Sequence, residues 1–458
     1  MAERRFADAV PIYERLVQAM PDNAGLRLNL AMALHFSGQA AKAIPHFEAV
    51  LKQQPGALPA LMLLGASYLS TGNPAKAVPP LEKAIALAPG DVEGRSMLVD
   101  ALLMLDRYEA AIPHLKKLTA AQPDNPRAWY LLGRAYENEA QRAFGALEKS
   151  GVDSPWWLAL AAEVRAKEGR NTAAFTLYRA VLEKMPSFRG AHLGLAEIYR
   201  KTNHPDWAAT EDEREKKLGA LACATPTAAC YYAKANYERA LAVAGAARTP
   251  EALYWQSRAA NELAAGAFAH LASLPPSLEL RQFTAELYRN QGRYADSIKE
   301  WQEAIRLAPD DPQLEQELVT TIYLNRDYAT AERMVRELLA KDPNAADLQF
   351  ILGDSLMNQQ RPEEAIAPLN QAISLRAEYP SAHAVLGRAL LQLDRASEAI
   401  PHLKAALPVD TDGSVYFQLS RAYQSTGQQA LADEARQSYQ KIRQSSATGD
   451  VAISAPDK

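Results

Sequence analysis

The sequence predicts an all-α protein, a solenoid of stacked antiparallel helix pairs, because one helical repeat returns along most of the chain. Prolines mark its period of 34 residues, and they stand at Pro21, Pro55, Pro89, Pro123, Pro309 and Pro343. In several of the repeats that begin three residues after such a proline, the eighth position holds a small residue and the twentieth holds alanine. A turn with glycine, such as Ser37-Gly38, separates the two halves of several repeats and ends the first helix.

The recurring small and large positions explain how two helices can pack closely. Position 8 holds Ala31, Gly65, Gly133, Gly353 and Gly387, and position 20 holds Ala43, Ala77, Ala111, Ala331, Ala365 and Ala399. Position 24 holds Phe47, Leu81, Leu115, Trp301, Leu369 and Leu403, and position 11 holds Tyr68, Tyr136, Tyr199, Tyr288 and Tyr423. We expect the large residues to fill the space between neighbouring repeats, since one repeat cannot bury its own apolar face.

This spacing sets the expected domain organisation. Full repeats lie at 24–57, 58–91, 92–125, 155–188, 278–311, 312–345, 346–379, 380–412 and 413–445, and weaker ones lie at 126–154, 189–218, 221–249 and 250–277. We therefore expect a half repeat with only the second helix at 1–23, an N-terminal array at 24–125, a central array with one shortened and one degenerate repeat at 126–218, atypical repeats at 219–277, a C-terminal array at 278–445 and a disordered tail at 446–458.

The 34-residue period, the small-large-small spacing and the closing proline resemble the tetratricopeptide repeat family. The resemblance covers nearly all of the chain except its ends. It implies a right-handed superhelix whose first helices line a concave groove, with positions 2, 5, 9, 12 and 13 of each repeat facing that groove. Some members clamp a chaperone's C-terminal carboxylate with Lys and Asn at set positions; Leu28, Met32 and Leu63 stand there in this chain, so that function is not supported.

Those positions, carried over to this sequence, give a predicted peptide-binding groove. Its residues are Leu28, Met32, Phe36, Met62, Leu69, Leu103, Tyr130, Arg134, Arg289, Tyr323, Phe350, Arg388, Phe417 and Arg421. The early part is apolar, and its flexible methionines suit an adaptable binding surface. We predict a non-enzymatic scaffold that binds a peptide or helix of a partner protein, and self-association is left open. The alternative is an accessory subunit of a cell-envelope export, assembly or polysaccharide machine whose N-terminal signal is missing from this chain.

Composition and charge argue against nucleic-acid binding and against a membrane-spanning helix, and the first residues bear on localisation. Lys and Arg number 50 against 54 Asp and Glu, for a net charge of -4, so the basic excess typical of nucleic-acid binding is absent. The uncharged stretch 53–75 is broken by several prolines and glycines and does not predict a membrane-spanning helix. The opening residues MAERRFADAV have no apolar core, which predicts a cytoplasmic protein by default, or a periplasmic or exported one if the N-terminus is truncated.

Two of the weak repeats, 126–154 and 250–277, resemble each other at an offset of 124 residues. The matches include Pro126, Tyr130, Phe144 and Leu147 with Pro250, Tyr254, Phe268 and Leu271. Both repeats have lost the turn between their helices, and we interpret them as parts of a duplicated block. The loss either changes the curvature of the superhelix to form a pocket or is an inherited deletion, and the pattern favours the deletion.

No motif predicts catalysis, a cofactor or a metal. Glycine-rich phosphate loops, HExxH and GxSxG are all absent. His46, His114 and His402 occupy one position in separate repeats, so they cannot share a metal at a ligand distance of about 2 Å. The mixed-charge run from Glu211 to Lys217 predicts a solvated helix face with i,i+4 ion pairs.

Cys223 and Cys230 leave two alternatives. Seven residues in one helix would separate their Cα atoms by roughly 10 Å, beyond the limit of about 7 Å for a disulfide. Thr225-Pro226, however, resembles a helix start, which places Cys223 in the preceding loop within reach of Cys230. We expect free thiols in a cytosolic protein and a disulfide in an exported one.

Overall fold

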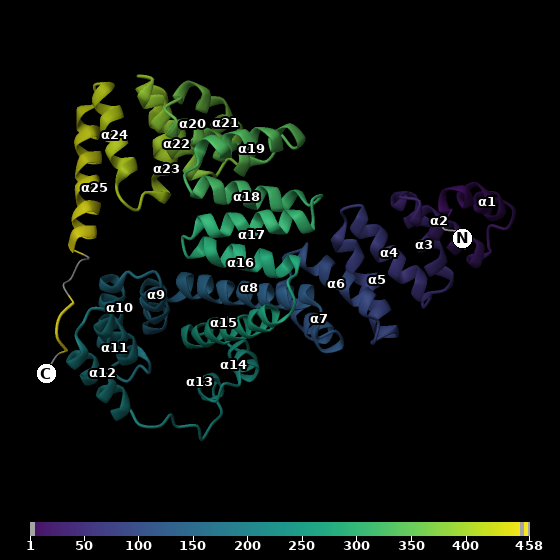
Figure 1. The fold of residues 1–458 in the computed structure, drawn as a ribbon, viewed down its shortest axis with the longest axis horizontal. Helices are drawn as coiled ribbons and strands as arrows, with labels where there is room; N and C mark the ends of the chain where they lie inside the picture. Colours follow the sequence, from purple (N-terminus) through teal and green to yellow (C-terminus); the bar gives the residue numbers. More distant parts are fainter. Residues whose placement is uncertain (1–4, 449–452, 457–458) are drawn as a thin grey trace. The chain divides into compact units, whose positions relative to one another are not determined.

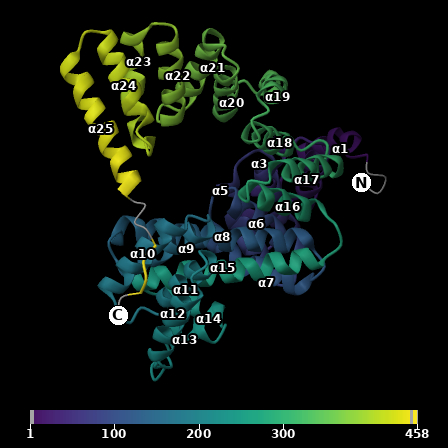
Figure 2. The same cartoon turned by 60° about the vertical axis from the view of Figure 1, so that its left-hand side comes forward.

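The computed structural model describes residues 5–448 and 453–456, and two views of it are shown in Figures 1 and 2. These residues form 25 α-helices and one short 3-10 helix, and none of them lies in a β-strand. The prediction of an all-α solenoid is confirmed. Two compact units can be distinguished: unit 1 is Met1–Val152 with Leu221–Pro275, and unit 2 is Asp153–Ala220 with Pro276–Lys458.

Except at α8 and α15, the helices alternate between first and second helices of the repeats. Unit 1 contains α1 (Phe6–Ala19), α2 (Ala24–Phe36), α3 (Ala40–Gln53), α4 (Leu58–Ser70), α5 (Pro74–Leu87), α6 (Val92–Leu103), α7 (Tyr108–Ala121), α8 (Pro126–Gly151), α13 (Ala228–Ala233), α14 (Tyr237–Ala244) and α15 (Pro250–Ser273). Unit 2 contains α9 (Pro155–Lys167), α10 (Asn171–Lys184), α11 (Ala191–Lys201), α12 (Pro205–Lys217), α16 (Leu278–Asn290), α17 (Tyr294–Leu307), α18 (Pro312–Leu324), α19 (Tyr328–Lys341), α20 (Ala346–Asn358), α21 (Pro362–Leu375), α22 (Pro380–Gln392), α23 (Ala396–Ala406), η1 (Leu407–Val409), α24 (Ser414–Ser425) and α25 (Gln429–Thr448).

The turn inside each regular repeat requires one residue with a left-handed backbone. Gly38, after α2, has a φ of 81° and Gly72, after α4, has a φ of 71°. Other repeats place a residue with a side chain in the same conformation, with φ between 54° and 64°, at Asp106, Arg326, Gln360 and Asp394. Such a residue costs about 1–2 kcal/mol more than glycine there. Helix packing must offset this cost in the repeats that lack glycine. The turn can therefore form with or without glycine, and glycine marks only some of the turns.

The predicted small positions lie at the contacts between helices. Ala43 and Ala77 have 0% exposed surface. A Cβ atom added at Gly65 would lie 2.5 Å from Cγ of Leu81, in the second helix of the same repeat. The large residue at position 24 therefore covers position 8 of its own repeat. The expected packing of these large residues against the neighbouring repeat stays a prediction.

The two short repeats are not shortened helix pairs. Each is one continuous helix, α8 of 26 residues and α15 of 24, and the two pack side by side (Figures 1 and 2). They run antiparallel, because the Trp129 ring lies 4.0 Å from that of His270 while Gln256 donates a hydrogen bond to Glu139. A Cβ atom at Gly133 would lie 2.5 Å from the Phe268 ring. Helix α15 thus takes the place that a second helix has in a regular repeat.

The α8–α15 pair also changes the expected domain boundaries. Within unit 1, α15 packs on α8, α14 packs on α15, and α13 contacts both α14 and α15. The chain therefore leaves unit 1 after α8, forms α9 to α12 in unit 2, and returns at Leu221. The expected central array, 126–218, is divided between the two units because the α8–α15 contact, and not the order along the chain, decides which helices belong together.

A polar pair joins the two helices in several repeats. The side chain at position 4 of the repeat, on its first helix, contacts the side chain at position 23 of the repeat, on its second helix. The pairs are Arg95 with His114 at 3.3 Å, Arg281 with Glu300 at 2.8 Å, and His383 with His402 at 2.8 Å. His114 and His402, which both follow Ile-Pro, therefore contact a side chain of their own repeat. In the part of the chain that the structure describes, no group of three or more His, Cys, Asp or Glu residues could hold a metal ion.

The charged run on α12 only partly faces solvent, which corrects the predicted solvated face. The Glu211 side chain is 1% exposed and accepts hydrogen bonds from His192 at 2.5 Å and Arg214 at 3.0 Å. The Glu215 carboxylate accepts from the backbone N–H of Gly190 at 3.0 Å. Glu211 occupies position 23, the inward position of the polar pair, which explains its burial.

The two ends of the chain differ from the expectation in detail. Helix α1 packs on α2, where the Phe6 and Phe36 rings lie 5.0 Å apart, as a half repeat that supplies only a second helix. Helix α25 continues to Thr448, three residues into the predicted disordered tail. Residues 1–4, 449–452 and 457–458 lie outside the described residues. Among the described helices, none is both long and apolar enough to cross a membrane.

Candidate functional site

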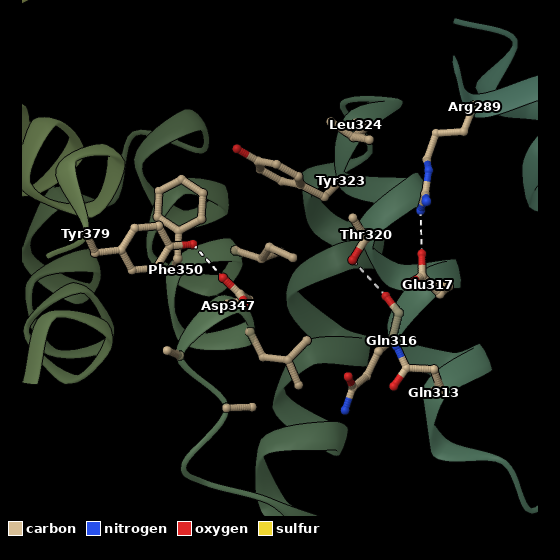
Figure 3. A pocket seen from close by; sticks show the side chains of 14 residues that line it. Arg289, Gln313, Gln316, Glu317, Thr320, Tyr323, Leu324, Asp347, Phe350 and Tyr379 are labelled. Carbon is tan, nitrogen blue, oxygen red and sulfur yellow. Dashed lines mark hydrogen bonds and ion pairs between the residues drawn. The ribbon is translucent and has the colours of Figure 1, made fainter. Parts of the chain in front are cut away.

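A cavity of about 500 Å³ opens on the first helices of the C-terminal repeats (Figure 3). Side chains of α16, α18 and α20 line it, together with Tyr379, the residue that precedes α22. These helices pack in succession within unit 2, with a second helix between each two of them. The cavity therefore lies on the face that first helices form in three consecutive repeats.

Three aromatic side chains give the cavity an apolar side. The Phe350 ring lies 6.5 Å from the Tyr323 ring and 5.2 Å from the Tyr379 ring, measured between centroids. Burial raises the pKa of Tyr323 and of Tyr379 above the usual value of a tyrosine, so both hydroxyls stay protonated at pH 7. The three rings offer a surface on which an apolar or aromatic side chain can pack.

Hydrogen bonds fix both tyrosines. The Tyr379 hydroxyl donates to Oδ1 of Asp347 over 2.9 Å, and Arg376 donates to both oxygens of the same carboxylate, each over 2.9 Å. This bidentate pairing with Arg376 holds the pKa of Asp347 below its usual range. A carboxylate that stays ionised keeps the Tyr379 hydroxyl pointing towards α20.

Tyr323 is fixed in the same manner from the next repeats. Its hydroxyl donates to Oδ2 of Asp354 over 2.8 Å, and Arg388 on α22 donates to Oδ1 of Asp354 over 2.9 Å. Tyr323, Asp354 and Arg388 therefore link three consecutive repeats, whereas Tyr379, Asp347 and Arg376 all lie within repeat 346–379. The aromatic side of the cavity is held in place before any ligand binds.

The opposite side of the cavity is polar but nearly neutral. Gln313 and Gln316 present amide groups that can both donate and accept hydrogen bonds. The Thr320 hydroxyl donates to the backbone carbonyl of Gln316 over 2.8 Å. Arg289 pairs with Glu317 at 2.5 Å, which leaves neither with an uncompensated charge. Amide groups facing aromatic rings suit a peptide, whose backbone needs both donors and acceptors.

The predicted groove residues are only partly brought together. Arg289, Tyr323 and Phe350 line the cavity, and Arg388 supports it through Asp354. The family positions 2, 5, 9, 12 and 13 of repeat 312–345 correspond to Gln313, Gln316, Thr320, Tyr323 and Leu324, all of which line the cavity. The positional pattern could thus have found them. Tyr379 has no such signal, because it lies in the turn between two repeats.

The other predicted groove residues lie elsewhere. Eight of them lie in unit 1, on α2, α4, α6 and α8, and all eight are partly or fully exposed: Leu28, Met32, Phe36, Met62, Leu69, Leu103, Tyr130 and Arg134. Phe36 is 48% exposed, while Tyr130 lies 6.5 Å from Phe268 of α15. In unit 2, Phe417 and Arg421 are exposed on α24, outside the cavity. The groove expected along the whole array is therefore divided between the two units.

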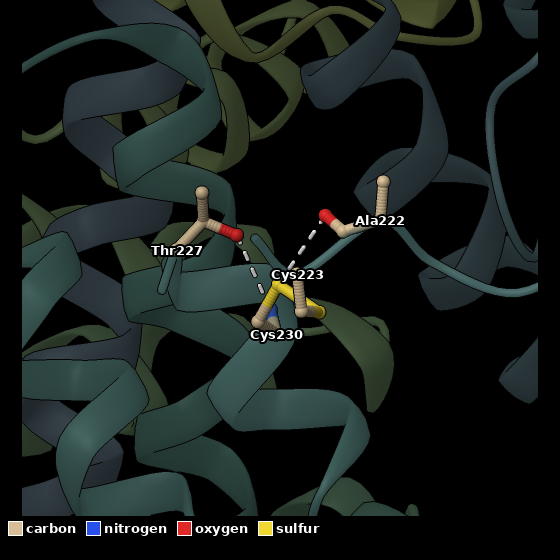
Figure 4. Close-up of a disulfide and its surroundings, with 4 residues drawn as sticks. All are labelled: Ala222, Cys223, Thr227 and Cys230. Carbon is tan, nitrogen blue, oxygen red and sulfur yellow. Dashed lines mark hydrogen bonds between the residues drawn. A yellow bond between two sulfur atoms is a disulfide. The ribbon is translucent and has the colours of Figure 1, made fainter. Parts of the chain in front are cut away.

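A disulfide joins Cys223 and Cys230, whose Cα atoms lie 5.8 Å apart (Figure 4). Thr227 caps α13 by accepting a hydrogen bond from the backbone N–H of Cys230 over 3.3 Å, so α13 begins after Cys223. Cys223 stands in the loop that leads into the helix, which is the arrangement that permits a disulfide at this spacing. The bond lies close to the point where the chain returns to unit 1.

Comparison with known proteins agrees with the repeat geometry. Models of the tetratricopeptide repeat match residues 1–44, 68–135 and 359–423 in one case and residues 28–92 and 323–383 in another. The chain belongs to the tetratricopeptide repeat family. Members of this family are in general scaffolds for protein interaction, and this protein shares their helical repeats. No curated protein matches the chain in sequence.

Several solved tetratricopeptide repeat structures are similar to parts of the chain. A MamA fragment from Desulfovibrio magneticus RS-1 is 21% identical, covers 43% of this chain and 95% of its own, and has a TM-score of 0.25. YrrB, described as a protein with an unusual peptide-binding site, is 16% identical over 45% of this chain and 92% of its own, with a TM-score of 0.25. A thermophilic member from Thermus thermophilus is 18% identical over 38% of this chain and 100% of its own, with a TM-score of 0.31.

Proposed function

We propose that this tetratricopeptide repeat protein is a non-enzymatic scaffold that binds an extended segment of a partner protein in the cavity on α16, α18 and α20. The observation that carries the proposal is the facing arrangement of aromatic rings and amide side chains in a cavity of about 500 Å³ (Figure 3). Gln313 and Gln316 can pair with the backbone of a peptide, and the rings of Tyr323, Phe350 and Tyr379 can receive one apolar or aromatic side chain.

The fixed tyrosines support this proposal further. The hydroxyls of Tyr323 and Tyr379 are already bonded to Asp354 and Asp347, so ligand binding does not have to order them. Preorganised side chains lower the entropic cost of association. The internal ion pairs, Arg289 with Glu317 and Arg376 with Asp347, leave the cavity without a strong net charge. The favoured ligand is therefore an uncharged, apolar-anchored segment, unlike the carboxylate that a chaperone clamp binds.

Selection from a phage-displayed library of random peptides tests the proposal. The full chain should enrich peptides that carry an apolar or aromatic side chain. Phe350→Ala should reduce binding of the enriched peptides by roughly tenfold or more, because a buried aromatic anchor typically contributes at least 1–2 kcal/mol.

Phe417→Ala provides the matched control. It removes the same side chain from a first helix in the same unit, but Phe417 is 48% exposed and lies outside the cavity. Peptide binding should be unchanged by this variant. Equal loss in the two variants, or enriched peptides that Phe350→Ala binds normally, would contradict binding in the cavity.

We also propose that the protein works in an oxidising compartment, as the envelope-associated alternative requires. The disulfide between Cys223 and Cys230 supports this, since such bonds persist outside the reducing cytosol. Thiol counting on the unfolded, unreduced protein from its native host should find no free thiol. Two free thiols would contradict this second proposal and leave the peptide cavity untouched.

A further inference from the structure

Unit 2 carries a second surface on which an extended segment is seated, and that segment belongs to the chain itself. The Tyr199 hydroxyl on α11 donates a hydrogen bond to the backbone carbonyl of Ser454 over 2.7 Å. Pro456 lines a cavity of about 200 Å³ together with side chains of α10, α11 and α12. We propose that this surface, here called the tail site, binds an extended, proline-containing segment and that its occupant is residues 453–456 of the same chain.

The repeat pattern shows what is unusual about Tyr199. Tyr68 occupies the same position 11 in its own repeat, and its hydroxyl donates to the carboxylate of Glu48, twenty residues earlier, at 2.5 Å. The residue twenty positions before Tyr199 is Arg179, whose guanidinium can only donate. At Tyr199 the carbonyl of Ser454 takes the place that the Glu48 carboxylate has beside Tyr68. The acceptor comes from a segment 255 residues away in the sequence.

The tail site is well ordered by interactions of its own helices. The Glu211 carboxylate is held between His192 at 2.5 Å and Arg214 at 3.0 Å, and its side chain is 1% exposed. The Tyr199 ring, with 0% exposed surface, is flanked by Phe175 at 5.9 Å and Trp207 at 5.5 Å. Such a rigid surface is suited to a segment with proline, because proline restricts the free segment and lowers the entropy lost on binding.

The apolar part of the tail site matches the segment that it holds. Leu182, Pro186 and Leu195 line the cavity beside Pro456. The segment reads Ile-Ser-Ala-Pro, with small side chains at its centre and apolar ones at its ends, and Ile453 and Pro456 are both partly buried. An extended backbone of small residues can approach α11 closely enough for its carbonyl to reach the Tyr199 hydroxyl.

Attachment to the same chain gives the segment a strong advantage over any free peptide. Attachment through a short stretch of chain typically produces an effective concentration in the millimolar range. A free peptide with the same chemistry therefore has to compete with a segment that is always close. Binding of such a peptide should be strong only when the segment has been removed.

An anisotropy titration tests this directly. The probe is a fluorescein-labelled synthetic peptide with the sequence of residues 446–458, titrated with the full chain and with a chain that ends at Thr448. The shortened chain should bind the peptide with saturation, and the full chain should bind it at least about tenfold more weakly. Absence of saturable binding to the shortened chain, or equal binding to both chains, would overturn the proposal.

Two tyrosine variants of the shortened chain localise the site. Tyr199→Phe removes only the hydroxyl that reaches Ser454 and should weaken peptide binding about three- to tenfold, the usual effect of one net hydrogen bond. Tyr423→Phe makes the same change at position 11 of another repeat, where the side chain is 5% exposed, and should leave binding unchanged. Equal affinity of the two variants, both with the melting temperature of the shortened chain, would contradict the tail site.

The oligomeric state decides whether the segment binds its own chain. Sedimentation of the full and shortened chains over a range of concentrations should give the mass of a monomer for each chain. A concentration-dependent dimer that disappears in the shortened chain would show that the segment binds a second copy, and would overturn the intramolecular occupant.

Discussion

The same packing contact is made in two regions of this protein over very different sequence distances. In the regular repeat of α20 and α21, a Cβ atom at Gly353 would lie 2.5 Å from Cγ of Leu369, sixteen residues later. In the α8–α15 pair, a Cβ atom at Gly133 would lie 2.5 Å from the ring of Phe268, which is 135 residues later. One contact closes a local hairpin, while the other joins the two ends of a long excursion of the chain.

This difference has consequences for stability. Regular repeats contact mainly their neighbours, so their stability is roughly a sum of local terms. The α8–α15 contact closes a long loop, and forming it costs more chain entropy than closing a hairpin. Buried side chains on both helices, among them Leu147 and Leu271 at 0% exposure, provide the favourable burial that offsets this cost. We expect unit 1 to depend on this pair more than unit 2 depends on any single repeat.

The largest effect should come from Phe268→Ala. Loss of this buried ring, 6% exposed, should lower the free energy of unfolding by roughly 3–5 kcal/mol. Native-state hydrogen exchange should speed up in both α8 and α15, because each helix loses its main partner. Leu369→Ala is the local counterpart, with an expected loss of about 2–5 kcal/mol and faster exchange confined to the repeats around α20 and α21. Faster exchange in α15 alone after Phe268→Ala would show that α8 does not depend on it.

An intermediate effect is expected from a small residue inside a regular repeat. Ala77→Leu should overpack the contact between α4 and α5 and lower stability by roughly 1–3 kcal/mol, since Ala77 has 0% exposed surface. The control is Ala41→Leu on α3, where the side chain is exposed and the change should have little effect. Chemical denaturation measures both variants. An unchanged midpoint for Ala77→Leu would mean that the phase of the repeats is wrong.

The two regions also show which contacts the sequence can reveal. Contacts within a regular repeat join fixed positions, so the period and the small-large spacing were enough to place Ala43, Ala77 and Gly353. No periodic signal connects Gly133 to Phe268, and the similarity of 126–154 to 250–277 was the only trace of their pairing. The absence of a turn was visible in both segments, but a missing turn is equally consistent with a short repeat and with one long helix.

In the candidate site, too, the residues at fixed repeat positions could be predicted and the others could not. Family positions on the first helices predicted Arg289, Tyr323 and Phe350, and the same positions include Gln313 and Gln316. Tyr379 could not be predicted in this manner, because turn residues have no assigned face. The burial of Glu211 and the contact of Tyr199 with Ser454 were also hidden, since charge composition does not show which side chain occupies an inward position.

The smallest effect concerns the pH dependence of the polar pairs, which differ between the two units. Burial lowers the pKa of His402 below 6.5, and the neighbouring His383 on α22 lowers it further, while Glu398 on α23 opposes the shift. Burial also lowers the pKa of His114 in unit 1, where Arg95 takes the place of His383. Because both folded-state values lie below the unfolded value, the unfolded chain binds more protons as the pH falls from about 6.5 towards the folded pKa, and stability falls with it.

The variants His402→Gln and His114→Gln separate the two contributions. Thermal melting between about pH 7.5 and 5.5 should show a declining midpoint for the wild-type protein, and each variant should decline less, by an amount of at most a few degrees. His402→Gln should have its effect on the part of the transition that reports unit 2, because His402 lies on α23 of that unit. His46→Gln, beside Arg27 in the first full repeat, is the matched comparison within unit 1. A midpoint that rises on acidification in the wild-type protein would contradict the direction of these pKa shifts.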